Sequence, residues 1–221
     1  MKSTLIQLTC SLQPIADPFV LIEALAKGKN VLNVGAAGGV RGYLPENRDI
    51  WLHERLLQVA RGVVGLDIDD EAIKYAAEYG VEIRNENCET MQLSEKFDLI
   101  VMSDVIEHVN APVNAIGNLL RHLSPGGVLV VTTPNATAGN IVLRALLRRP
   151  FNVLGDHVTL YYPEHFQAIC DRVGGRIQSI GMFDHVDRRT MSTRIKSRMF
   201  RLMTRFSPRL SSSMLVVIGN E

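Results

Sequence analysis

Short apolar runs alternate with amphipathic stretches along most of the chain. Many runs are rich in β-branched residues and apolar throughout, which is typical of strands buried on both faces of a parallel sheet. Seven runs predict strands, over residues 31–34, 63–66, 81–83, 97–102, 128–132, 176–183 and 214–219. With helices between them, the pattern predicts an α/β protein with a single doubly wound, mostly parallel seven-stranded sheet and helices on both faces.

Helix signals fall between these predicted strands. Asp17 followed by Pro18 is typical of a helix cap and a first helical position, which predicts a helix that runs to about residue 27. Further helices are expected over residues 50–60, 69–79, 105–109 and 113–123. The residues Pro125-Gly126-Gly127 are expected to form a turn before the fifth strand.

The residues that follow the strands matter most, because ligands of such sheets bind beyond the carboxyl ends of the strands. The first strand leads into Gly35-Ala36-Ala37-Gly38-Gly39, where the backbone can turn tightly and lie against a ligand. The second ends at Asp67, whose carboxylate can accept two hydrogen bonds from a ribose diol. Asp67 could equally cap the next helix. Together the two features indicate an adenosine-containing ligand.

Two other nucleotide sites fit the sequence less well. A dinucleotide-binding fingerprint needs G-x-G-x-x-G, but Gly35 is followed at that spacing by Ala37 and Val40. No Gly-Lys-Ser or Gly-Lys-Thr occurs, so the phosphate-binding P-loop is absent. The glycine spacing therefore disfavours a nucleotide-dependent oxidoreductase.

Composition narrows the class of protein further. The chain has 221 residues, 46% hydrophobic and 21% charged, which predicts a single globular domain over residues 1–221. No apolar run approaches the ~20 residues that a membrane span needs. The three cysteines lie far apart without metal-ligand spacing and favour a reducing compartment. We therefore expect a cytoplasmic protein.

Charge is distributed unevenly along the chain. Residues 1–110 carry 10 basic and 17 acidic side chains and residues 111–221 carry 14 and 6, giving net charges of −7 and +8. Residues 188–209 hold eight basic residues, no acidic one, and apolar residues at helical spacing. They predict a basic amphipathic insert before the last strand. Its apolar face either packs on the sheet, which we favour, or contacts an anionic membrane. With few aromatic residues among the arginines and a net charge of +1, we expect no nucleic-acid partner.

Four stretches together resemble the class I S-adenosylmethionine-dependent methyltransferases, and in particular the branch with the ubiquinone-biosynthesis O-methyltransferases. They are the glycine-rich loop of residues 31–39, the strand end at residues 64–68, residues 97–109, and the segment 119–135 with its Pro-Gly-Gly sequence. The resemblance implies a Rossmann-like methyltransferase fold and S-adenosylmethionine as cofactor. It also implies an insert over residues 136–162 that forms a lid on the acceptor side.

The resemblance implies a set of cofactor-binding positions: Asn33, Gly35, Ala37, Gly39, Asp67, Ile68, Asn87, Cys88 and Ser103. The glycines and the backbone of Ser103 would approach the methionine part. Asp67 would bind the ribose hydroxyls and Ile68 would pack on adenine. Asn87 and Cys88 fall where the family contacts the adenine edge.

Three of these positions depart from the family pattern. The family usually has an acid at the position of Asn33, a glycine at that of Ala37 and often an acid at that of Asn87. The resemblance implies methyl transfer, most directly to oxygen of a small or lipid/glycan-linked acceptor. The departures keep open the alternative of a non-catalytic binding module with the same fold.

A hydroxyl acceptor must lose a proton to a base or a metal. His108 and His157 are the candidate catalytic residues. On a helix, Asp104, Glu107 and His108 would share one face, where relatives hold magnesium. The alternative, which we favour, is that Glu107 and His108 shape the loop or contact substrate with no metal. His157 could instead fasten its loop.

The remaining histidines are not candidates for the site. They are expected at the surface or on helix faces: His53, His122, His165 and His185.

Overall fold

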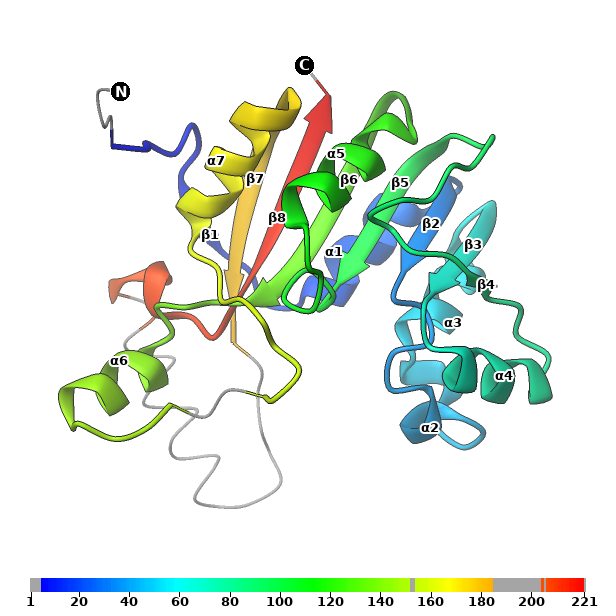
Figure 1. The fold of residues 1–221 in the computed structure, drawn as a ribbon, viewed down its shortest axis with the longest axis horizontal. Helices are drawn as coiled ribbons and strands as arrows, with labels where there is room; N and C mark the ends of the chain where they lie inside the picture. The colour runs from blue at the N-terminus through cyan, green and yellow to red at the C-terminus, as the bar shows by residue number, and fades with distance from the viewer. Residues whose placement is uncertain (1–4, 152–153, 185–203, 205, 221) are drawn as a thin grey trace.

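The computed structural model describes residues 5–151, 154–184, 204 and 206–220. Its centre is one eight-stranded sheet in the order β1-β7-β8-β6-β5-β2-β3-β4 (Figure 1). The strands are β1 (Leu12–Pro14), β2 (Asn30–Val34), β3 (Gly62–Asp67), β4 (Arg84–Asn85), β5 (Phe97–Ser103), β6 (Leu123–Pro134), β7 (Gly175–Phe183) and β8 (Ser213–Asn220). β8 runs antiparallel to both β6 and β7, and all other pairings are parallel. The predicted doubly wound, mostly parallel sheet is confirmed.

The sheet has one strand more than the sequence predicted. β1 adds to the edge beside β7, with Leu12 opposite Ile180. It is only three residues long, contains the polar residue Gln13 and has no buried residue of its own. A strand this short and exposed leaves no apolar run for sequence analysis to detect.

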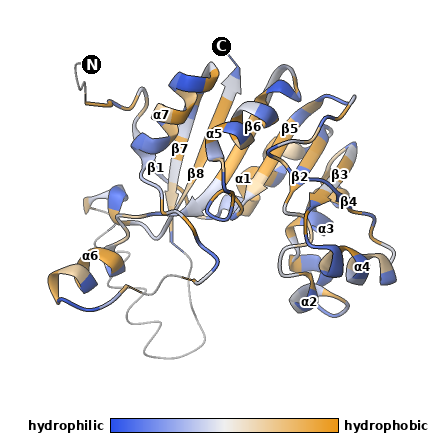
Figure 2. Cartoon of the chain, viewed as in Figure 1, coloured by the Kyte–Doolittle hydropathy of each residue, from blue (hydrophilic) through white to orange (hydrophobic). Residues whose placement is uncertain are grey.

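Helices cover both faces of the sheet, as predicted. They are α1 (Pro18–Ala26), α2 (Val40–Tyr43), α3 (Leu52–Val59), α4 (Asp70–Glu78), α5 (Pro112–Arg121), α6 (Gly139–Leu146) and α7 (Pro163–Val173), with short 3-10 helices η1 (Arg48–Ile50) and η2 (Pro208–Leu210). On one face α5 and α7 bury Ile116 and Phe166 against the sheet. On the other, α1 and α3 bury Ile22 and Leu56. The strands between the two layers are hydrophobic along most of their length (Figure 2).

Two local predictions are wrong. The third strand was expected over residues 81–83, but β4 pairs with β3 only at Arg84 and Asn85. Val81 and Ile83 are instead buried against α4, so these apolar side chains pack on a helix and do not mark a strand. A turn was expected at residues 125–127, but these residues lie within β6. The pairing of β6 with β5 is irregular there: Phe97 pairs with Leu123, whereas Leu99 pairs with Val128.

Most of the predicted basic insert, residues 188–209, lies outside the described residues. Its last two residues, Pro208 and Arg209, belong to η2. The expected lid, residues 136–162, includes α6, which extends away from the sheet (Figure 1). Within the described part of the chain, no helix is both long enough and apolar enough to cross a membrane.

Candidate functional site

A cavity of about 640 Å³ opens at the carboxyl ends of β2, β3 and β5. Seven of the residues singled out in the sequence line it: Asn33, Gly35, Gly39, Asp67, Ile68, Ser103 and His108. They come from segments that lie far apart in sequence and meet because parallel neighbouring strands end at the same edge. The cavity thus lies at the edge of the sheet where the sequence predicts a ligand.

The glycine-rich loop forms one wall of this cavity. Gly35 has a φ of +74°, a conformation that glycine adopts without strain. A Cβ on Gly35 would lie 2.3 Å from Cγ2 of Val105, so the loop also approaches the turn after β5 too closely for any side chain. The N–H groups of Gly35 and Ala36 both donate to the carbonyl of Leu66, which ties the loop to β3.

The carboxylate of Asp67 is held in place by the backbone. Its Oδ2 accepts from the N–H of Ala37 at 2.8 Å, and its Oδ1 accepts from the N–H groups of Ile68 and Asp69 at 2.8 and 3.1 Å. An ionised carboxylate has about four lone-pair sites, so acceptor capacity remains for a ligand. Asp67 is therefore a fixed acceptor at the rim of the cavity.

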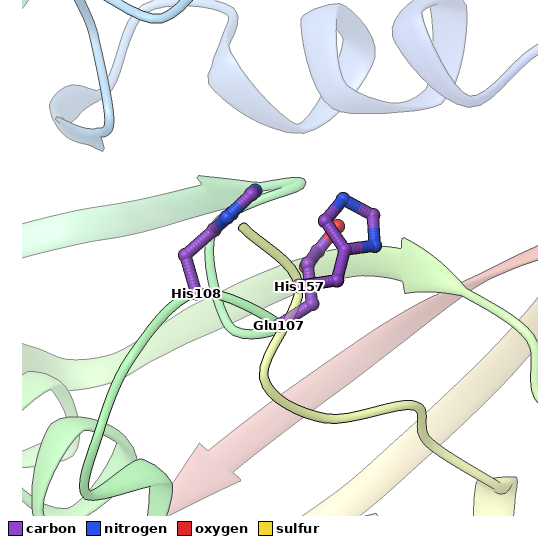
Figure 3. A group of neighbouring side chains, drawn as sticks. All are labelled: Glu107, His108 and His157. Atoms are coloured by element: carbon purple, nitrogen blue, oxygen red, sulfur yellow. The ribbon is translucent and has the colours of Figure 1, made fainter. Parts of the chain in front are cut away.

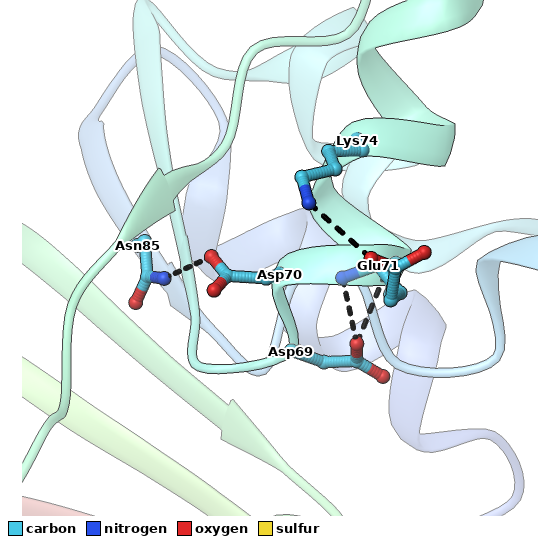
Figure 4. A network of polar contacts seen from close by, with 6 residues as sticks. Asp69, Asp70, Glu71, Lys74 and Asn85 are labelled. Atoms are coloured by element: carbon cyan, nitrogen blue, oxygen red, sulfur yellow. Dashed lines mark hydrogen bonds and ion pairs between the residues drawn. The ribbon is translucent and has the colours of Figure 1, made fainter.

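Asp67 is not the cap of the following helix, because Asp69 takes that role. The side chain of Asp69 accepts from the N–H groups of Glu71 and Ala72 at the start of α4 (Figure 4). Asn85 of β4 donates to Asp70, and Lys74 lies 3.2 Å from Glu71 in the same network. These contacts fasten α4 beside β4 and leave Asp67 for the cavity.

Three of the predicted binding residues do not line the cavity. Ala37 is buried and contributes its N–H to Asp67. Asn87 lies in an exposed segment, where its side chain accepts from the N–H of Glu89. Cys88 is buried, and desolvation raises the pKa of its thiol to about 11. The side chain of Cys88 packs in the core beneath α5, since Asn118 of that helix donates to the Cys88 carbonyl.

A cluster of three potential ligand side chains adjoins the cavity. Glu107, His108 and His157 offer atoms that all lie within 4.8 Å of one another (Figure 3). His108 belongs both to this cluster and to the cavity wall. His108 therefore joins the cluster to the cavity.

Glu107 is buried in an unusual way. It is 1% exposed, its Oε2 accepts from the Thr133 hydroxyl at 3.0 Å, and its Oε1 has no hydrogen-bond partner within the described residues. Desolvation raises the pKa of Glu107 to about 7, and the nearby Asp104 adds to the rise. Such an oxygen can hold or release a proton near neutral pH.

The loop that carries His157 is docked on Glu107. The Glu107 carbonyl accepts from the N–H groups of Val158 and Thr159, and His108 Nδ1 lies 3.0 Å from the Asp156 carbonyl. The rings of His108 and His157 meet edge to face, with centroids 4.7 Å apart. His108 and His157 are thus brought together although 49 positions separate them in the sequence.

The prediction of a helix over residues 105–109 is wrong. Asp104, Glu107 and His108 therefore do not share a helical face. These residues form a turn, and Asp104 has a φ of +51°. The carbonyl of Glu107 accepts hydrogen bonds from the loop of His157 and not from a following turn of helix. Among the described residues, the cluster that could ligate a metal has His157 in place of Asp104.

Among the polar residues of the cavity that sequence analysis missed is His53. It was expected on a surface or helix face, but it is 2% exposed and lines the cavity beside Asn33. His122 is also buried, away from the cavity, whereas His165 is exposed as expected and His185 lies outside the described residues. No short-range pattern distinguishes a buried histidine on a helix from an exposed one.

Comparison with known families shows which family the chain belongs to. A family described as "Methyltransferase domain" matches residues 12–180 of the chain. Among curated proteins, the ubiquinone biosynthesis O-methyltransferase of Haemophilus ducreyi is 30% identical over 122 residues, which cover 50% of this chain and 47% of that protein. That of Coxiella burnetii (strain RSA 493) is 27% identical over 131 residues, covering 56% and 51%. The chain spans about half the length of the curated relatives it matches.

Solved structures share the fold. The magnesium protoporphyrin IX methyltransferase of Synechocystis, with S-adenosylhomocysteine bound, superposes with a TM-score of 0.60 at 16% identity, covering 92% of this chain and 79% of that one. An N-methyltransferase of Bradyrhizobium japonicum, also with S-adenosylhomocysteine, gives 0.56 at 16% identity, covering 92% and 88%. At such identities the likeness concerns the fold alone.

Proposed function

The chain belongs to the class I S-adenosylmethionine-dependent methyltransferases, and from this we propose that it binds S-adenosylmethionine in the cavity at the ends of β2, β3 and β5. The methyl group is transferred to oxygen of a small or lipid/glycan-linked acceptor. The observation that carries this proposal is the carboxylate of Asp67, held by backbone N–H groups against the glycine-rich loop at the wall of one cavity.

The cavity residues suit the three parts of the cofactor. Asp67 accepts hydrogen bonds from the ribose hydroxyls, and the side chain of Ile68, 68% exposed without a ligand, covers the adenine. The loop at Gly35 lies along the methionine part, where no side chain keeps the backbone away. Ser103, at the end of β5, is next to the sulfonium.

Methyl transfer from a sulfonium is an in-line displacement, so the protein mainly holds acceptor and methyl group in line and excludes water. A hydroxyl acceptor must also lose its proton. His108 Nδ1 donates to the Asp156 carbonyl, which leaves Nε2 of the neutral ring free to take that proton. His157, whose ring touches that of His108, is the second candidate base, and the Glu107 carboxylate lies beside both rings.

Two observations support the type of acceptor. The curated relatives of the chain are named as O-methyltransferases of ubiquinone biosynthesis. In the lid, Leu146, Leu147 and Leu154 are 76%, 53% and 66% exposed, near Arg148 and Arg149. An apolar surface with adjacent positive charge suits an acceptor carried on a lipid or held at an anionic membrane.

The cluster of Glu107, His108 and His157 also offers ligands for a divalent cation, with His157 in place of the Asp104 that the resemblance implied. One carboxylate oxygen and two imidazoles form a mixed donor set, and the unpartnered Oε1 of Glu107 is a ready ligand. Such an ion would polarise the acceptor oxygen as a Lewis acid. If a cation binds there, millimolar Mg²⁺ or Mn²⁺ raises the thermal midpoint of the parent protein but not that of Glu107→Gln. Equal midpoints with and without metal contradict the metal site.

The proposed function is tested by incubating the protein with S-adenosylmethionine labelled in its methyl group and an extract of metabolites and lipids. Labelled product is expected with the parent protein. Asp67→Ala should weaken cofactor binding at least about tenfold, because a charge-assisted hydrogen bond contributes roughly 1.5–3 kcal/mol. A parent protein with no affinity for S-adenosylmethionine contradicts the proposal.

The base assignment needs variants of its own. His108→Asn and His157→Asn are expected to lower turnover about 10²-fold or more while cofactor affinity is retained. Unchanged turnover in one variant excludes that histidine as the base. Unchanged turnover in both excludes a histidine base altogether.

A further inference from the structure

Two buried polar side chains meet in the wall of the cavity. Asn33 is the third position of the run Val31–Val34 on β2, and His53 lies in the first turn of α3. They are 3% and 2% exposed, and the Asn33 Nδ2 lies 3.1 Å from His53 Nδ1. Both residues line the cavity.

In the structure the amide nitrogen of Asn33, and not its oxygen, faces the ring of His53. An amide Nδ2 can only donate, so His53 Nδ1 accepts and the ring carries its proton on Nε2. Desolvation lowers the pKa of His53 to about 4, which keeps the ring neutral at ordinary pH. The amide of Asn33 therefore has one defined orientation, with its nitrogen toward α3.

The ring of His53 is itself held in place. The ring packs directly on Gly65 of β3, since a Cβ at that position would lie 2.8 Å from Cε1 of His53. Glycine leaves the room that the ring needs. The Trp51 ring also contacts that of His53, at a centroid distance of 5.2 Å. His53 is thus an orienting group that cannot turn away easily.

We propose that His53 is a positioning residue for cofactor binding, which holds the Asn33 amide so that its oxygen, and not its nitrogen, is the atom left for the ligand. This inference rests on the proposed function. In that function Asp67 takes the ribose hydroxyls and Ile68 lies on the adenine, so the donor left for Asn33 Oδ1 is the ammonium of the methionine part. A freely turning amide would present its N–H₂ to that cation half of the time and repel it.

The test measures the dissociation constant of S-adenosylmethionine for full-length variants by calorimetry. His53→Leu, which cannot accept a hydrogen bond, is expected to bind about tenfold more weakly, the effect of one hydrogen bond to a charged group. His53→Gln offers an acceptor oxygen and is expected to stay within about threefold of the parent protein. Asn33→Leu is expected to lose as much as His53→Leu.

The double variant decides whether His53 acts through Asn33. If it does, Asn33→Leu/His53→Leu binds no more weakly than Asn33→Leu alone, because coupled residues are not additive. Additive losses, or parent-like binding by His53→Leu, overturn the inference. If the parent protein binds no S-adenosylmethionine, the proposed function itself fails, which is a different outcome.

A matched control separates positioning from stability. His122 is a second buried histidine that accepts from the N–H of Leu93, away from the cavity. His122→Leu is expected to lower the melting temperature and leave the dissociation constant unchanged. Should His53→Leu fail to fold, the ¹⁵N shifts of the parent protein still test the inference: the Nε2–H tautomer of His53 is expected, and the Nδ1–H tautomer overturns it.

Discussion

The side chain of Glu107 is almost fully withdrawn from solvent, yet one of its oxygens has no hydrogen-bond partner within the described residues. Burying an ionised group in this way costs free energy, and buried groups with shifted pKa values cluster at functional sites. The two histidines beside Glu107 and the Thr133 hydroxyl are the reason why we propose that it holds a proton or a cation. At the residue scale, the candidate site thus combines a buried carboxylate with two histidines that are partly exposed.

The ionisation of Glu107 predicts a pH-dependent stability. Its pKa rises from 4.5 to about 7 on folding, so the native state binds more protons than the unfolded state between these values. The contribution of Glu107 to the free energy of unfolding is fully present below about pH 4.5. It decreases by roughly 3 kcal/mol as the pH rises through about 7. Glu107→Gln removes the titration, so its stability relative to the parent protein should improve by that amount between pH 4.5 and pH 8.

Urea unfolding at several pH values measures this difference. Glu82→Gln, a change at an exposed carboxylate, serves as the control and is expected to show little pH-dependent difference. A stability difference between Glu107→Gln and the parent protein that stays constant with pH would contradict the raised pKa of Glu107.

Gly65 gives a second prediction at this scale. A methyl group there would meet Cε1 of His53 at 2.8 Å and Cβ of Ala36 at 3.1 Å. Gly65→Ala is therefore expected to cost about 1–3 kcal/mol in unfolding free energy, because overpacking displaces neighbours in a close-packed interior. Gly42→Ala, where the added Cβ has nothing within 4 Å, is the matched control for chemical denaturation. Equal stability of the two variants would show that His53 can move freely.

At the scale of elements, the described structure follows the sequence where the signal is local. The buried runs of β2, β3 and β5 are apolar throughout, and Asp17 caps α1 as expected. The juxtaposition of Glu107 with His157 could not be predicted, because the loop of residues 156–159 docks through backbone bonds that any sequence could make. The burial of His53 depends likewise on Gly65, which lies on a different element.

The lid around α6 gives a prediction about a partner surface. If it approaches an anionic membrane, Leu146→Ser/Leu154→Ser should weaken sedimentation with vesicles that contain phosphatidylserine by tenfold or more, since burying one leucine contributes about 1.5–3 kcal/mol. Val20→Ser, a change at a 57% exposed residue of α1, is the control. Equal binding of the two variants, or no binding by the parent protein, contradicts a membrane role for the lid.

At the scale of the whole molecule, the cavity draws its wall from the glycine-rich loop, η1, α3 and the ends of β2, β3 and β5. A ligand that binds only the native state stabilises all of these together. S-adenosylmethionine at 100 times its dissociation constant is expected to add about 2.7 kcal/mol to the unfolding free energy of the parent protein. Asp67→Ala at the same concentration should gain far less, and a thermal shift assay compares the two.

β8 lies between β6 and β7, and β7 in turn pairs with β1 from near the start of the chain. During synthesis, the centre of the sheet therefore stays open until residues 213–220 have left the ribosome. Until then β6 and β7 each offer an unpaired backbone edge to other nascent chains, and such edges favour aggregation.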